Sequence, residues 1–244
     1  MSIRRVMVRR LAAAVALTSV ANAPLAAQDG LQAWRWKVAP YLAATAMTGE
    51  AAIGEVHVDA GASDVFSNLE FAFMGYVEGM RDEWGVGLDI IYGELTTPLS
   101  DPSGELTVTQ GTYTATVIRQ LTSSTNAYAG ARWNSLSAKI VLPGTAGDTR
   151  KEKDWVDPVL GASIDHPLGE RWRLSVVGDV GGFGLGSQLS GQLWPNVFLD
   201  IATNGRLGLG YRLLYVNYKD DAGARYFEYD ILTHGPTFGF VFLL

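Results

Sequence analysis

The sequence predicts an all-β protein, a transmembrane antiparallel up-and-down β-barrel of about ten strands, with eight to twelve compatible. From Trp34 onward, apolar and polar residues alternate with a period of two over segments of about ten residues. The breaks between these segments alternate between long and short. After the first 30 residues, no window approaches the apolar length of a spanning helix. The exception to the strand pattern is 62–69, where Ser63 or Asp64 could cap one helical turn in a loop.

Ten segments carry the alternation, in chain order 34–46, 69–78, 84–92, 112–121, 128–134, 156–165, 173–180, 192–201, 206–215 and 227–244. In the first, Trp34 and Trp36 share one face and Arg35 and Lys37 the other. The later segments repeat this pattern with Leu, Val, Ile and aromatic residues on one face. In 112–121 threonines form the second face, and in 128–134 small residues alternate with larger ones. A soluble sandwich would alternate too, so the pattern alone does not identify the solvent on the apolar side.

The loop lengths favour a barrel in an outer membrane. Long breaks at 48–68, 96–104, 142–153, 185–191 and 219–225 alternate with short ones at 82–83, 122–125, 167–170 and 204–205. Outer-membrane barrels have short turns on the periplasmic side and longer loops outside. Ten strands joined by nine connections place both termini of the chain on the short-turn side.

Composition excludes several function classes. The 244-residue chain has no cysteine, which excludes disulfides, cysteine metal sites and thiol nucleophiles. Its formal charge is −6, and four of its 19 basic residues (Arg4, Arg5, Arg9 and Arg10) lie within the first ten positions. An acidic chain without a later basic run is a poor partner for nucleic acid.

Residues 1–27 are predicted to be a signal peptide, followed by a barrel domain at 28–244. The four arginines precede a short apolar run from Leu11 to Val20, which is about half the length of a spanning helix. Cleavage is expected after Ala27, with Ala23 as the alternative. The chain is therefore expected to be exported and to reach the cell outer membrane.

Tryptophans and prolines refine this prediction. Trp34, Trp84 and Trp172 each begin a strand at the periplasmic side, where an interfacial girdle is expected. Core tryptophans of a soluble β-domain are the alternative. Four prolines fall within predicted strands and require bulges or strand ends, namely Pro40, Pro158, Pro195 and Pro236. Around Pro236 the apolar face changes from odd to even numbers, which predicts a one-residue bulge.

The C-terminal segment 237–244 (TFGFVFLL) resembles the terminal strand by which outer-membrane barrels of Gram-negative bacteria are recognised for insertion. Phe238, Phe240, Phe242 and Leu244 carry this resemblance, with Leu244 where the family usually has Phe. The segments WRWKVAPYL, GDVGGFG, GYRLLYVNY and HGPTFGFVF are similar to those of a family of small proteobacterial outer-membrane barrels. The resemblance implies fold and location, and it brings no catalytic motif.

No catalytic, metal or cofactor site is predicted. His57, His166 and His234 lack metal-ligand spacing. Only His57 is expected on the extracellular side, in the first long loop. A barrel enzyme acting on lipid or peptide at the outer rim would have to use it, and a solvated surface histidine is the simpler interpretation.

Charged residues on the polar face are predicted to line the lumen. The set is Glu70, Glu78, Asp89, Arg132, Asp157, Asp179, Asp200 and Arg212, with Arg35 and Lys37 on the first strand. They would form either a cation-favouring pathway for solute or a plug of ion pairs, and a barrel of about ten strands favours the plug. Inward glycines (Gly85, Gly87, Gly208 and Gly210) could leave a thin passage.

The functional hypothesis is a narrow channel or a structural and surface-contact protein. Its expected partners are membrane lipid, lipopolysaccharide and the outer-membrane insertion machinery, and no solute is identified. A soluble periplasmic β-domain with a lipocalin-like cup is the third alternative.

Overall fold

The structure is a computed structural model that describes residues 33–53, 69–100, 103–141, 149–220 and 227–244. The described residues all belong to the second of two units into which the chain divides, Gln32–Leu244. The predicted signal peptide and His57 lie outside the described residues. So does the predicted helical turn at 62–69 except for Leu69, which begins a strand. Within the described ranges, no helix is long and apolar enough to cross a membrane.

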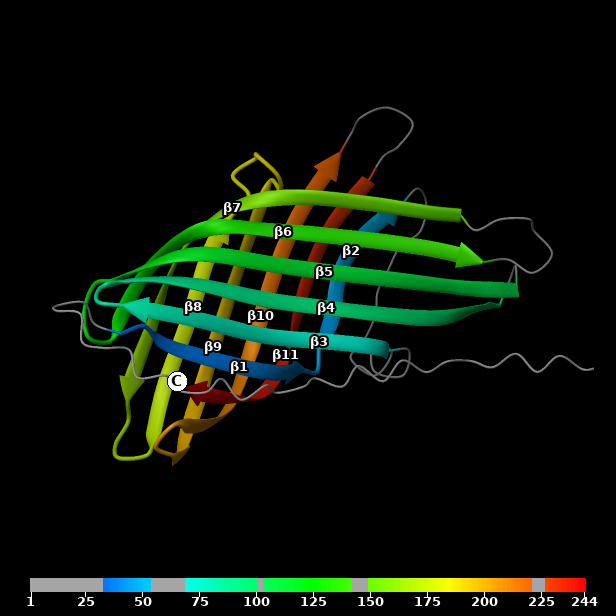
Figure 1. The fold of residues 1–244 in the computed structure, drawn as a ribbon. Helices are drawn as coiled ribbons and strands as arrows, with labels where there is room; N and C mark the ends of the chain where they lie inside the picture. Colours follow the sequence, from blue (N-terminus) through cyan, green and yellow to red (C-terminus); the bar gives the residue numbers. More distant parts are fainter. Residues whose placement is uncertain (1–32, 54–68, 101–102, 142–148, 221–226) are drawn as a thin grey trace, which may run out of the picture. The chain divides into compact units, whose positions relative to one another are not determined.

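The second unit is a closed antiparallel β-barrel, which confirms the predicted fold class (Figure 1). The sheet order is β1-β3-β4-β5-β6-β7-β8-β9-β10-β11-β2, and pairing of β1 with β11 closes the ring. The strands are β1 (Arg35–Ala43), β2 (Ala46–Ile53), β3 (Leu69–Arg81), β4 (Trp84–Ser100), β5 (Ser103–Gln120), β6 (Thr125–Val141), β7 (Thr149–Pro167), β8 (Trp172–Gly181), β9 (Leu189–Ala202), β10 (Gly205–Asp220) and β11 (Phe227–Leu243).

Strands β1 and β2 together occupy one position in the ring. β1 pairs with the end of β11, from Lys37↔Leu243 to Ala43↔Thr237. β2 pairs with the beginning of β11, from Ala46↔His234 to Ile53↔Phe227. The first predicted strand is therefore interrupted at 44–45 and continues to Ile53, so the following loop begins later than predicted.

The short turns lie where the sequence predicts them, between β3 and β4, β5 and β6, β7 and β8, and β9 and β10. The prediction of a long loop at 96–104 is wrong, because β4 and β5 stay paired up to Ser100↔Ser103. Strands β4 to β7 have 17, 18, 17 and 19 residues and form the long sheet across the front of Figure 1. Cross-strand pairs of polar residues help to stabilise the extended parts of these strands, as where the Thr96 and Thr107 hydroxyls lie 3.1 Å apart.

Each of the four prolines lies where a hydrogen-bonded ladder ends or is interrupted. Pro40 is the last β1 residue paired with β3, and Pro158 directly precedes the first β7 residue paired with β8. The β9–β10 pairing omits Pro195, and Pro236 faces the break between β1 and β2. A residue without an N–H is tolerated at such positions.

The predicted bulge at Pro236 is wrong. The register of β10 with β11 runs without a shift from Gly205↔Phe242 to Asp220↔Phe227. The odd-numbered residues Phe227, Tyr229 and Ile231 are buried, whereas Phe238, Phe240 and Phe242 are exposed. The apolar residues change from the inner to the outer face of a regular strand because the barrel interior is itself apolar in one half. This half, farther from the short turns, is called the outer half.

The outer surface of the barrel is an apolar band. Large hydrophobic side chains are exposed on every strand from β3 to β11, among them Phe71, Leu88, Val117, Trp133, Leu160, Val180, Leu193, Leu209 and Phe240. On β4 the band runs from Trp84 to Tyr92, a length of about 27 Å along the tilted strand. An exposed apolar surface that encircles a closed barrel is the surface that lipid covers.

Candidate functional site: a buried ion-pair layer and a cavity

The inner face of the barrel holds the predicted charged residues at two levels. Asp89, Arg132, Asp157, Asp179 and Arg212 are buried in the middle of the barrel. Glu78 and Asp200 lie nearer the short-turn end, on β3 and β9. Glu70 belongs to β3, but its side chain lies outside the described residues. A role of these residues in solute passage stays a prediction.

Arg132 and Asp179 form a fully buried ion pair between β6 and β8. Arg132 Nη2 donates to Asp179 Oδ1 at 2.9 Å and to Oδ2 at 2.8 Å, and both side chains have no solvent exposure. Arg132 Nε also donates to Thr114 Oγ1 at 3.2 Å. Alternation places all three on the inner face, where an unpaired charge would carry a large desolvation cost.

Arg212 forms a second ion pair on the other side of the lumen. Its Nη2 donates to Asp89 Oδ2 at 2.5 Å, and its Nη1 donates to the Tyr41 hydroxyl at 2.6 Å. Tyr41 in turn donates to Asp89 Oδ1 at 2.8 Å. The guanidinium also lies over the Trp194 ring, 4.7 Å from its centroid. Arg212 thereby connects its own strand β10 with β1, β4 and β9.

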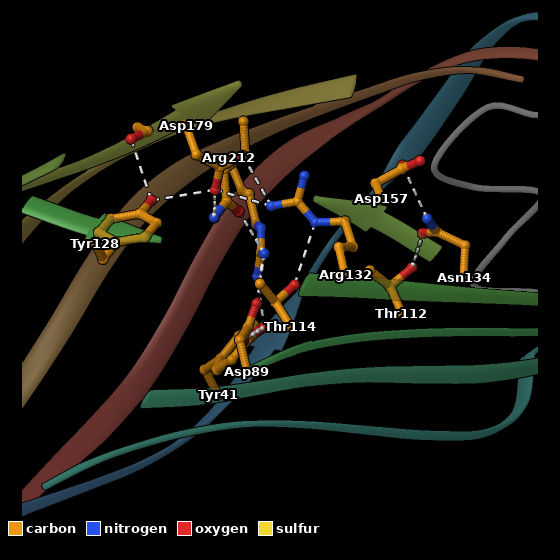
Figure 2. A network of polar contacts seen from close by, with 12 residues as sticks. Tyr41, Asp89, Thr112, Thr114, Tyr128, Arg132, Asn134, Asp157, Asp179 and Arg212 are labelled. Atoms are coloured by element: carbon orange, nitrogen blue, oxygen red, sulfur yellow. Dashed lines mark hydrogen bonds and ion pairs between the residues drawn. The ribbon is translucent and has the colours of Figure 1, made fainter. Parts of the chain in front are cut away.

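Gln192 connects the two ion pairs, whose members Asp89, Arg212, Arg132 and Asp179 are labelled in Figure 2. Its Nε2 donates to Asp179 Oδ2 at 2.6 Å, and its Oε1 accepts from Arg212 Nη2 at 2.6 Å. Tyr128 also donates to Asp179 Oδ2 at 3.1 Å. The result is one continuous polar layer across the middle of the barrel, from β1 and β4 through β10 and β9 to β8 and β6.

Asp157 is held by neutral donors. Ser187 contributes its backbone N–H at 2.5 Å and its hydroxyl at 2.8 Å, and Asn134 contributes its amide at 3.3 Å. Trp155 Nε1 donates to the same Ser187 hydroxyl at 2.9 Å. These bonds anchor Ser187, which belongs to the turn after β8, against the inner face of β7. Nothing in the sequence around Ser187 marks it as a partner of Asp157.

The outer half of the interior is an apolar core that sequence analysis missed. Its buried members are Leu136, Trp155, Leu214, Val216, Phe227, Tyr229 and Ile231. Trp155 stacks on Tyr218 with ring centroids 4.4 Å apart and also contacts Phe227 and Tyr229. The phase change in β11 is the sequence signal of this core, and it does not mark a bulge.

Inward-facing glycines lie against side chains of the neighbouring strand. A Cβ at Gly87 would lie 2.7 Å from Thr116 Oγ1, and one at Gly208 would lie 2.5 Å from the Phe198 ring. Gly208 also belongs to the wall of the cavity described below. A thin passage past these glycines stays a prediction.

Substitution of Gly210 by alanine is expected to destabilise the barrel by about 1–3 kcal/mol, because the new Cβ would lie 2.7 Å from the Pro195 carbonyl oxygen. Gly93→Ala is the matched control, since nothing lies within 4 Å of its Cβ position. Its effect should stay within about 0.5 kcal/mol. Urea unfolding in lipid vesicles measures both, and equal effects would contradict the close packing at Gly210.

Between the polar layer and the short-turn end lies a cavity of about 140 Å³. Its walls include Tyr41, Asp89 and Gln192 of the polar layer at one end. Lys37, Asp165 and Arg206 line the other end, near the short turns. Lys37 Nζ lies 2.8 Å from Glu78 Oε1, and Arg206 Nε donates to Asp200 Oδ1 at 2.7 Å. The interior therefore has three layers: apolar core, polar layer and cavity.

The remaining predicted residues lie on the outer face. Trp34, Trp84 and Trp172 are exposed at the short-turn ends of β1, β4 and β8, with Trp34 stacked on Trp36. Phe238, Phe240, Phe242 and Leu244 are exposed as well. Their roles as a girdle and an insertion signal stay predictions. His234 is an outer-face residue whose Nδ1 lies 2.7 Å from the Tyr211 hydroxyl.

A closed antiparallel barrel with an apolar outer band and short turns at one end defines an outer-membrane β-barrel protein. No protein-family model and no curated protein matches the chain, so membership of the proteobacterial family suggested by the sequence stays a prediction. Within the described residues, no group of three or more His, Asp or Glu could hold a metal ion.

Comparison with solved structures found matches of low overall similarity. A FadL homologue from Pseudomonas aeruginosa shares 8% identity, with 86% of this chain and 89% of that chain covered and a TM-score of 0.36. The translocator domain of the autotransporter NalP from Neisseria meningitidis shares 11%, with 88% and 90% covered and a TM-score of 0.37. The toluene transporter TbuX of Ralstonia pickettii shares 8%, with 86% and 88% covered and a TM-score of 0.34. Similarities at this level transfer no function to this chain.

Proposed function

We propose that this outer-membrane barrel is closed to solute in the conformation described and serves as a structural and surface-contact protein. The observation that carries the proposal is the filling of the interior at two successive levels. The polar layer crosses the lumen with buried, mutually bonded side chains, and the apolar core fills the outer half. A solute would have to displace both, and breaking a buried ion pair is costly.

The long strands supply the surface for contact. Beyond the apolar band, the outer face of β4 to β7 becomes polar, as at Glu94, Thr109, Ser137 and Arg150. Arg150 Nε donates to Ser137 Oγ at 3.1 Å, and Thr109 Oγ1 donates to Glu94 Oε2 at 3.4 Å. Such cross-strand bonds stabilise a polar sheet outside the membrane. An ordered polar sheet is suited to contact lipopolysaccharide sugars or proteins at the cell surface.

Single-channel recording in planar bilayers tests the proposal. Refolded wild-type protein should give no stable conductance steps, and Asp89→Asn and Asp179→Asn should be silent too. A conducting porin in the same bilayers is the positive control, and heat-modifiable migration in gels shows that each variant is folded. Stable cation-selective steps in the wild type, reduced in the two variants, would contradict closure and identify a channel.

The narrow channel is the second candidate, because the cavity leaves the short-turn half of the lumen unfilled. The barrel-enzyme alternative rests on His57, which lies outside the described residues. Comparison of wild type with His57→Ala in lipid and peptide hydrolysis screens tests it, and activity lost in the variant would support an enzyme.

A further inference from the structure

We propose that the cavity beneath the polar layer is a binding site for a small neutral molecule with an apolar ring and one hydroxyl group, such as a phenol. Access is from the short-turn end of the barrel. The proposal concerns a different part of the molecule from the surface-contact sheet, and it holds or fails independently of that role.

The size of the cavity sets the size of the ligand. Its volume is about 140 Å³. An apolar cavity of about 150 Å³ is known to accept benzene. The cavity therefore accommodates one six-membered ring with a small substituent.

The wall chemistry favours an apolar body with a polar group. Ile118, Val177 and Phe198 supply apolar surface from β5, β8 and β9. Asn126 and Ser175 supply neutral hydrogen-bonding groups that can donate or accept. Binding sites for small molecules commonly combine an apolar wall with a few polar groups in this way.

The charged groups at the cavity are already neutralised by one another. Glu78 has Lys37 Nζ at 2.8 Å and accepts from the Tyr76 hydroxyl at 2.8 Å. Asp165 accepts from Arg173 Nε at 2.8 Å. A charged ligand would lose its hydration without gaining an unpaired counter-charge, so a neutral ligand is preferred.

Solvent exposure indicates the direction of access. The Asp179 side chain is fully buried and that of Asp89 is 9% exposed, both at the polar layer. Exposure rises to 29% for Asp165 and 35% for Lys37 at the short-turn end. Water, and hence a small solute, reaches the cavity from that end.

The test is binding of 4-fluorophenol to the full barrel in phosphatidylcholine nanodiscs, followed by fluorine NMR, with empty nanodiscs to subtract partitioning into lipid. Wild type should bind the probe saturably at one site. Val177→Phe fills the cavity and should weaken binding by about tenfold or more. Val180→Phe is the matched control, because Val180 belongs to the same strand and is 52% exposed on the outer face. It should change binding by about twofold at most.

Two charged probes test the preference for a neutral ligand. 4-Fluorobenzoate and 4-fluorobenzylammonium should each bind about tenfold more weakly than 4-fluorophenol. The proposal would be overturned by absence of saturable binding in wild type, by equal losses in Val177→Phe and Val180→Phe, or by equal binding of a charged probe.

The absence of native cysteine permits a second test that does not depend on folding of Val177→Phe. A Ser175→Cys variant carries a single thiol in the cavity wall and should react with N-ethylmaleimide, more slowly when 4-fluorophenol is present. Ser190→Cys is the control, because Ser190 is fully buried outside the cavity wall and should not be labelled. Labelling of Ser175→Cys at the same rate with and without the probe would refute the site.

Discussion

Replacement of Arg132 by methionine is expected to destabilise the barrel by about 3–5 kcal/mol. Arg132 has no solvent exposure and supplies both of its bonds to Asp179 from one nitrogen. Methionine retains much of the side-chain volume but leaves the Asp179 carboxylate buried without its cation. Urea unfolding in lipid vesicles, followed by tryptophan fluorescence, measures the loss.

Two further variants separate the charge effect from packing. Arg119 lies on the neighbouring strand β5, pairs with Glu83, and has a side chain that is 40% exposed. Arg119→Met should therefore cost no more than about 1 kcal/mol. The double variant Arg132→Met/Asp179→Leu removes both buried charges and should recover most of the stability lost in the single variant. A double variant no more stable than Arg132→Met would contradict the assignment of the cost to an unpaired charge.

Replacement of Trp155 by alanine is expected to cost about 3–5 kcal/mol. The substitution removes the stack on Tyr218, the contacts with Phe227 and Tyr229, and the hydrogen bond to Ser187. The cavity left in the outer half cannot collapse easily, because strands on both sides are held in the closed ring. The same unfolding measurement applies.

Trp133→Ala is the control for this variant. Trp133 lies at the same level of the barrel, because the next residue, Asn134, pairs with Trp155. The Trp133 side chain points to the outer face, where it is 46% exposed and stacks on Tyr113. Its loss should cost less than half as much, because lipid replaces part of the contact. If the two variants were equally destabilised, Trp155 would not belong to a packed core.

Much of the barrel could be predicted from the sequence because strand alternation is a local property. The faces of Arg132, Asp157 and Asp179 follow directly from their spacing, and so do the short turns beside Trp84 and Trp172. The local pattern was less reliable at strand ends. Thr96 lies in the predicted loop 96–104, but it continues the β4–β5 ladder by pairing with Thr107.

The alternation of residues was sufficient to predict about ten antiparallel strands, each with one apolar and one polar face over the membrane span, and to predict which residues share a face. The arrangement of strands in the ring sets which side chains meet across the lumen, since Asp89 and Arg212 are 123 residues apart in the chain. It also decided that Phe227, Tyr229 and Ile231 cover one another instead of facing lipid. Alternation distinguishes the two faces of a strand, but closure of the ring sets what each face contacts.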